Sequence, residues 1–116
     1  MFALAATPPL APPAAPARVL GFADEFRFSL SRAGFPAGPL VLQLKNNGED
    51  DHDLRIVGPH GAIRTGTGIV SPDDLGEIRT TLAQGRYTYL CTVADHAARG
   101  MTGSFIVTAR KRAQRR

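Results

Sequence analysis

The chain has 116 residues, the length of a single domain, and 43% of them are apolar, as in an ordinary globular protein. No stretch approaches the roughly 20 consecutive apolar residues of a membrane-spanning helix, so the sequence excludes such a span. The net charge of +4 is concentrated at the carboxyl end, because five of the 14 basic residues lie in the terminal segment RKRAQRR. Without them, nine basic residues face ten acidic ones. The body therefore carries about −1, which argues against a nucleic-acid-binding surface.

The amino-terminal segment MFALAATPPLAPPAAPA (residues 1–17) is rich in alanine and proline and carries no charged side chain. It lacks the positively charged start and the uninterrupted apolar run of a secretion signal, so it gives no convincing signal peptide. We expect residues 1–17 to form a disordered leader or linker. Residues 18–109 then form the folded domain, and residues 110–116 form a basic tail.

From Arg18 onward, apolar and polar residues alternate with a period of two, which predicts half-buried β-strands. Turn-forming clusters of Gly, Pro, Asn and Asp separate the alternating segments. About seven short strands of this kind predict an all-β fold, an antiparallel β-sandwich with Greek-key connections. A short helical segment is expected only near Asp73–Leu75. The clearest strands are predicted at 25–31, 39–45, 53–57, 86–91 and 103–107.

The single cysteine, Cys91, excludes an internal disulfide and raises the question of what the thiol does. A lone cysteine is more often a small core residue, but here His96 and Met101 follow at equal intervals in CTVADHAARGM. This loop joins two predicted strands, and Gly100 lets the backbone turn back, so the three side chains can converge at one end of the sandwich. His52 also lies just before a predicted strand.

A thiolate, two imidazoles and a thioether suit copper much better than calcium or magnesium. His52, Cys91 and His96 would supply three strong ligands in one plane, and Met101 would supply a weak axial one, as in a mononuclear blue (type 1) copper site. Taken alone, Met101 would more often be a core residue. His60 is expected to be a solvated loop residue. The predicted metal ligands are therefore His52, Cys91, His96 and Met101, and they hold one copper ion that cycles between Cu(I) and Cu(II).

The motif around these ligands resembles the cupredoxin family of small blue copper proteins, over roughly residues 22–108. The resemblance implies a sandwich of seven to eight strands and the transfer of single electrons between redox partner proteins. It also implies a location outside the cytoplasm, in the periplasm or at the cell surface. The pattern that carries it is His52 … Gly85-x-Tyr87-x-Tyr89-x-Cys91-x4-His96-x3-Gly100-Met101-x-Gly103.

One position departs from the family pattern, in which Asn commonly follows the first histidine ligand. Here the residue is Asp53, and we expect it to accept a hydrogen bond from Thr92. Its negative charge would favour Cu(II) and lower the reduction potential. Small residues beside His96 are expected to leave its ring edge near solvent as the port for electrons. One of the two tyrosines, Tyr87 or Tyr89, is expected to bond the backbone as a tyrosine corner.

The sequence leaves other functions open besides electron transfer. A copper-handling protein that stores copper or delivers it to a cuproenzyme would use the same ligands with faster exchange, and a structural or binding module would leave the site unused. A cysteine hydrolase is disfavoured, because Cys91 ends a strand near Asp95 rather than lying at a helix amino terminus. By the resemblance, copper enzymes of this fold have histidines next to the cysteine, whereas Leu90 and Thr92 flank it here. We therefore expect no enzyme.

The basic tail has two interpretations. It is either a solubilising segment, or it makes peripheral contact with an anionic membrane or an acidic redox partner through Arg110–Arg116. We expect a monomer that binds no nucleic acid.

Overall fold

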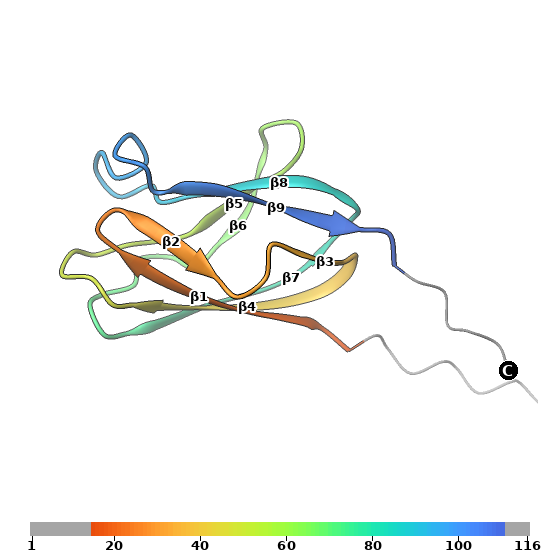
Figure 1. Cartoon of the computed structure of the whole chain (residues 1–116), viewed down its shortest axis with the longest axis horizontal. Coiled ribbons are helices and arrows are strands. Elements are labelled where there is room, and N and C mark those ends of the chain that lie inside the picture. Colours follow the sequence, from red (N-terminus) through yellow and green to blue (C-terminus); the bar gives the residue numbers. More distant parts are fainter. Residues whose placement is uncertain (1–14, 111–116) are drawn as a thin grey trace, which may run out of the picture.

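The computed structural model describes residues 15–110, which form two β-sheets packed face to face (Figure 1). Among these residues there is no helix, and hence none long and apolar enough to cross a membrane. The strands are β1 (Ala17–Asp24), β2 (Arg27–Leu30), β3 (Gly34–Pro36), β4 (Gly38–Asn46), β5 (Arg55–Val57), β6 (Ile63–Gly66), β7 (Leu75–Leu82), β8 (Gly85–Leu90) and β9 (Thr102–Thr108).

One sheet has four strands in the order β2-β1-β4-β7, and the other has five in the order β3-β9-β8-β5-β6. The predicted all-β sandwich is confirmed. However, β1 pairs with β4, and β3 with β9, in parallel, so the sheets are mixed rather than purely antiparallel as expected. The reason is the path of the chain: β3 crosses to the second sheet, and β4 then returns to the first sheet on the free side of β1.

The folded region begins with β1 at Ala17, one residue before the predicted boundary, and its last strand ends at Thr108. Residues 1–14 of the predicted leader and residues 111–116 of the predicted tail lie outside the described residues. The helical segment expected near Asp73–Leu75 is wrong. Ser71 and Asp74 close a turn, in which the Asp74 N–H donates to the Ser71 carbonyl at 3.0 Å, and Leu75 begins β7.

The core between the sheets is built from the alternating residues of the strands. In β4, Leu40, Leu42 and Leu44 are 1%, 0% and 0% exposed. Burying a leucine side chain contributes about 1.5–3 kcal/mol to the free energy of folding, so these three residues stabilise the packing of the first sheet on the second. The period of two predicted from the sequence is thus the one that the packing uses.

Aromatic rings fill the second sheet's side of the core. Tyr87 and Tyr89 of β8 both stack on Phe105 of β9, with ring centroids 5.6 and 6.0 Å apart. The Tyr87 hydroxyl donates a hydrogen bond to the Ala83 carbonyl at 2.8 Å. Tyr87 is therefore the tyrosine corner that the sequence predicted.

The connections that matter for function gather at one end of the sandwich. The connection between β8 and β9, the one between β4 and β5, and the β1–β2 hairpin lie together at the end of the sandwich opposite the end of β9 (Figure 1). All the predicted metal ligands belong to the first two of these connections. The two sheets therefore serve as a frame that brings distant parts of the sequence to one point.

Candidate metal centre

His52 is held in place by the backbone on both sides. It forms an isolated β-bridge with Val70, in which each backbone N–H donates to the other residue's carbonyl, at 3.1 and 2.7 Å. Asn46, at the end of β4, is fully buried, and its amide donates to the carbonyls of Asp50 and Val70, both at 2.8 Å. The Gly48 N–H donates to the Asn46 side-chain oxygen at 2.8 Å. Asn46 thus fixes the loop that carries His52.

The second ligand loop closes on itself through three backbone hydrogen bonds. The Cys91 N–H donates to the Met101 carbonyl, the Met101 N–H to the His96 carbonyl, and the His96 N–H to the Val93 carbonyl, each at 3.1 Å. Gly100 has a φ of 113°, a conformation that favours glycine, so the reversal expected at this residue is present. The loop geometry is therefore set by the backbone.

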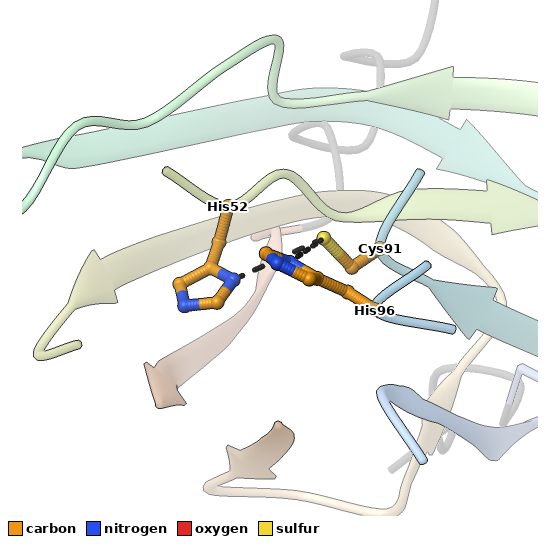
Figure 2. A group of neighbouring side chains, drawn as sticks. All are labelled: His52, Cys91 and His96. Carbon is orange, nitrogen blue, oxygen red and sulfur yellow. Dashed lines mark hydrogen bonds between the residues drawn. The ribbon is translucent and has the colours of Figure 1, made fainter. Parts of the chain in front are cut away.

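The structure brings His52, Cys91 and His96 together as a buried cluster, shown in Figure 2. The Cys91 Sγ lies 3.6 Å from the His96 Nδ1 and 4.0 Å from the His52 Nδ1. The three donor atoms all lie within 4.8 Å of one another. Both imidazoles thus turn the same nitrogen toward the thiol.

These separations fit a single metal ion. Bonds of about 2.0 Å to nitrogen and 2.3 Å to sulfur, as at zinc, separate the nitrogen and sulfur atoms of a trigonal site by about 3.7 Å. The two observed nitrogen–sulfur separations, 3.6 and 4.0 Å, lie close to this value. The donor set of one thiolate and two imidazoles is the one that copper prefers.

Met101 and His60, the other two residues considered from the sequence, differ in burial. Met101 is fully buried in the same core cluster as Cys91, and its role as an axial ligand stays a prediction. His60 is exposed, as expected, and is not part of the cluster.

Asp53 lies directly beside the cysteine loop. It is 1% exposed and accepts hydrogen bonds from the Thr92 backbone N–H at 2.6 Å and from the Thr92 hydroxyl at 2.5 Å. The expected contact between Asp53 and Thr92 is therefore present. Burial raises the pKa of the Cys91 thiol, and the charge of Asp53 acts in the same direction. A metal ion bound at this position would hold the sulfur as a thiolate.

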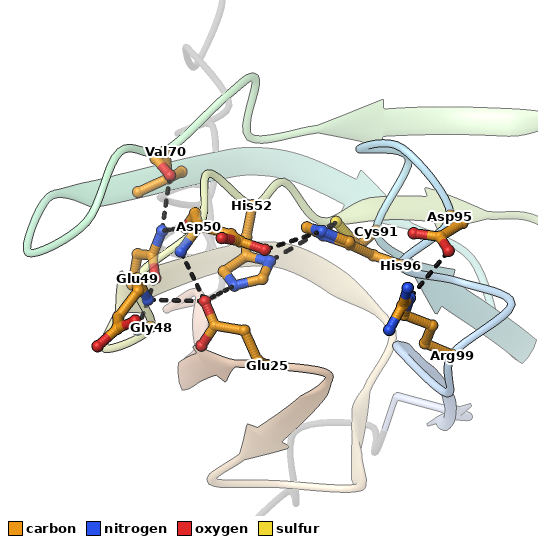
Figure 3. A network of polar contacts seen from close by, with 11 residues as sticks. Glu25, Gly48, Glu49, Asp50, His52, Val70, Cys91, Asp95, His96 and Arg99 are labelled. Carbon is orange, nitrogen blue, oxygen red and sulfur yellow. Dashed lines mark hydrogen bonds and ion pairs between the residues drawn. The ribbon is translucent and has the colours of Figure 1, made fainter.

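The outer nitrogen of each imidazole faces a carboxylate (Figure 3). The His52 Nε2 lies 3.5 Å from Glu25 Oε1, and the His96 Nε2 lies 3.4 Å from Asp50 Oδ2. Glu25 accepts the backbone N–H groups of Glu49 and Asp50, and the bond from Asp50 is the main cause that holds the pKa of Glu25 below its usual value.

The His96 ring is more enclosed than the sequence suggested. Its side chain is only 6% exposed, because Asp50 covers the outer nitrogen and the Phe26 ring packs with its centroid 5.0 Å away. The Arg99 guanidinium lies over the Phe26 ring, 4.9 Å from its centroid. The ring edge is therefore near solvent but largely covered, since small neighbours within the loop do not prevent residues of other loops from packing on it.

Glu25 and Asn46 were not identified from the sequence. Glu25 lies in the β1–β2 hairpin and Asn46 ends β4, so both precede His52 by several residues or more. The only local signal is the run NNG at 46–48, in which a glycine follows two residues favoured in turns.

No family model matches the sequence, and no curated protein matches it at a significant level. Solved structures do. The dithionite-reduced auracyanin from the photosynthetic bacterium Roseiflexus castenholzii is 22% identical, with a TM-score of 0.69 over 82% of this chain and 99% of that one. Auracyanin A, a blue copper protein from Chloroflexus aurantiacus, is 21% identical, with a TM-score of 0.69 over 81% of this chain and 100% of that one.

Rusticyanin from Thiobacillus ferrooxidans is 24% identical, with a TM-score of 0.62 over 80% of this chain and 77% of that one. At these identities the likeness shows the fold. The buried cluster of His52, Cys91 and His96 is an independent observation, and it involves the same residues that the motif identified. The chain therefore has the fold of the cupredoxins, with this cluster at one end of the sandwich.

Proposed function

We propose that the chain is a mononuclear type 1 copper protein that carries single electrons between redox partners. The observation that carries the proposal is the convergence of the Cys91 sulfur and the two Nδ1 atoms of His52 and His96 in a buried cluster. Copper held there supplies a one-electron couple between Cu(I) and Cu(II).

The residues around the cluster are suited to this task because the backbone fixes them. The bridge between His52 and Val70 and the closed loop from Cys91 to Met101 position the donor atoms through main-chain hydrogen bonds. Burial of His52, Cys91 and His96 excludes water from the donor atoms. A frame of this kind favours similar ligand positions in both oxidation states, which keeps the structural cost of electron transfer small.

Electron transfer and copper delivery are separated by two rates on the same protein. Stopped-flow mixing of the Cu(II) form with a small inorganic reductant measures electron uptake, and a strong Cu(I) chelator measures metal loss. An electron carrier is expected to be reduced within milliseconds to seconds and to lose its metal far more slowly than it exchanges electrons. Metal loss to the chelator that keeps pace with reduction would favour a delivery protein instead.

The proposal extends to location and partners. The family resemblance supports a location outside the cytoplasm, and fractionation of the cells that produce the protein tests it. Recovery with the cytoplasmic fraction would contradict it. The partner is proposed to be another redox protein, and the chain itself transforms no substrate, because Leu90 and Thr92 flank Cys91 and offer no ligand to a second metal.

A further inference from the structure

The outer nitrogen of His52 has an unusual environment. The side chain is 0% exposed, and within the described part of the chain its Nε2 has no hydrogen-bond partner of normal length. The group that faces it is the Glu25 carboxylate, with Oε1 at 3.5 Å. A buried donor without a partner costs about 1–3 kcal/mol, so this arrangement calls for an explanation.

Glu25 is placed there by contacts that do not involve the histidine. Its Oε1 accepts the backbone N–H groups of Glu49 at 2.7 Å and Asp50 at 2.6 Å. A Cβ at position 48 would lie only 2.5 Å from the carboxylate, so Gly48 leaves the space that the carboxylate occupies. The β1–β2 hairpin and the β4–β5 connection thus meet at the Glu25 carboxylate, beside His52 (Figure 3).

We propose that Glu25 is the positioning residue of His52. The negative charge of its carboxylate, facing Nε2 at 3.5 Å, favours the tautomer that carries the proton on Nε2 and so leaves the lone pair of Nδ1 directed toward Cys91. A carboxylate behind a ligating imidazole fixes the ring and its tautomer, and it increases the donor strength of the ligating nitrogen. Stronger donation favours Cu(II), so Glu25 lowers the reduction potential. This redox part rests on the proposed function, whereas the tautomer does not.

The contact between Asp50 and His96 has a similar distance but a different environment. The Asp50 side chain is 51% exposed, whereas Glu25 is 28% exposed and faces a fully buried ring. Water screens an exposed carboxylate, so its effect on the imidazole is weaker. The structure therefore assigns the stronger tuning role to Glu25.

The first test uses the metal-free protein. Nitrogen and proton NMR with labelled histidines is expected to show His52 as the Nε2–H tautomer, with a proton that exchanges slowly with water. Glu25→Gln keeps an oxygen acceptor but removes the charge, so the Nε2–H resonance should move upfield. Glu49→Gln removes the same charge from an exposed side chain that points away from His52 in Figure 3, and should leave the resonance in place. An Nδ1–H tautomer in the wild type would overturn the proposal without any variant.

The second test uses the copper-loaded variants. Loss of such a partner typically weakens metal affinity 10- to 100-fold, so Glu25→Gln should bind Cu(II) at least tenfold more weakly. If Cu(I) affinity is unchanged, tenfold corresponds to a rise of about 59 mV in potential. Equal potentials for Glu25→Gln and Glu49→Gln would overturn the redox part. A wild type that binds copper without blue colour would contradict the proposed function, and the metal-free resonance would still decide the role of Glu25.

Discussion

Asp53 is a buried carboxylate that contacts Thr92 and Arg55. The Thr92 N–H ties it to the residue after Cys91, and Arg55 Nε lies 3.6 Å from its Oδ2. A negative charge so near the thiolate should favour Cu(II) over Cu(I). The cluster of His52, Cys91 and His96 therefore lies in an acidic surrounding.

Asp53→Asn is expected to raise the reduction potential, because it removes that charge while an amide oxygen still accepts the Thr92 N–H. The free energy of unfolding should fall by about 1 kcal/mol, since Arg55 loses its partner but is 42% exposed and regains water. Redox titration and chemical denaturation measure the two effects. Asp51→Asn, at an exposed neighbour, is the control, and an equal potential in both variants would contradict a local role for Asp53.

Met101→Leu tests the predicted axial ligand. Leucine fills a similar volume, so stability should change by less than about 1.5 kcal/mol. The blue absorption should persist and the potential should rise, because a weak donor to Cu(II) is replaced by an apolar group. His60→Ala should change neither property. A Met101→Leu protein with an unaltered potential would remove Met101 from the ligand set.

The meeting of Cys91 with His96 could be predicted from the sequence because their spacing is local. Cys91, His96 and Met101 share one loop, and that loop closes through bonds among its own residues. Glu25 and Asn46 could not be predicted, because their roles depend on which connections meet in space. That meeting is decided by the sheet topology and not by any neighbouring motif.

At the scale of the strands, the sequence predicts most clearly the strands whose core-facing side chains are large and apolar. In β4 the inward positions are all leucines, and the alternation is plain. In β7 the inward row contains Thr80 between the buried Ile78 and Leu82, so the apolar spacing appears irregular. In β1 the buried Gly21 and Ala23 are small, while Phe22 is 36% exposed. Such strands are defined by pairing with β4, which no local pattern reveals.

The tyrosine corner gives a prediction at this same scale. Tyr87→Phe removes the hydrogen bond to the Ala83 carbonyl but keeps the ring that stacks on Phe105. The free energy of unfolding should fall by about 1 kcal/mol, measured by denaturation of the copper-free protein. The copper spectrum should not change, because the β7–β8 connection lies at the far end from the ligand loops (Figure 1). An unchanged stability would mean that the corner does not brace the sheets.

At the scale of the whole molecule, charge is distributed unevenly. Acidic residues gather around the metal centre, among them Glu25, Asp50, Asp53 and Asp95. The basic residues of the carboxyl-terminal segment follow β9, whose end lies at the opposite end of the sandwich (Figure 1). A role of this segment in membrane or partner contact stays a proposal.

Truncation after Thr108 tests the proposed role of that segment. The copper spectrum should be unchanged, because all candidate ligands precede the cut. Binding to anionic lipid vesicles should fall, at roughly 1 kcal/mol per basic residue near the surface, and the difference should fade as salt shortens the screening length to about 8 Å. Equal vesicle binding by both proteins would exclude the membrane contact. Equal electron-transfer rates with an acidic partner across a salt series would exclude docking as well.

The most direct test of the copper centre is the visible spectrum of the purified protein with one equivalent of Cu(II). The convergence of Cys91, His52 and His96 predicts an intense blue absorption from thiolate-to-copper charge transfer. Cys91→Ala should abolish the colour while the circular dichroism spectrum still shows a folded β-sheet protein. A wild-type protein that binds one copper ion and stays colourless, or a Cys91→Ala variant that stays blue, would contradict the assignment of this cluster as a type 1 copper site.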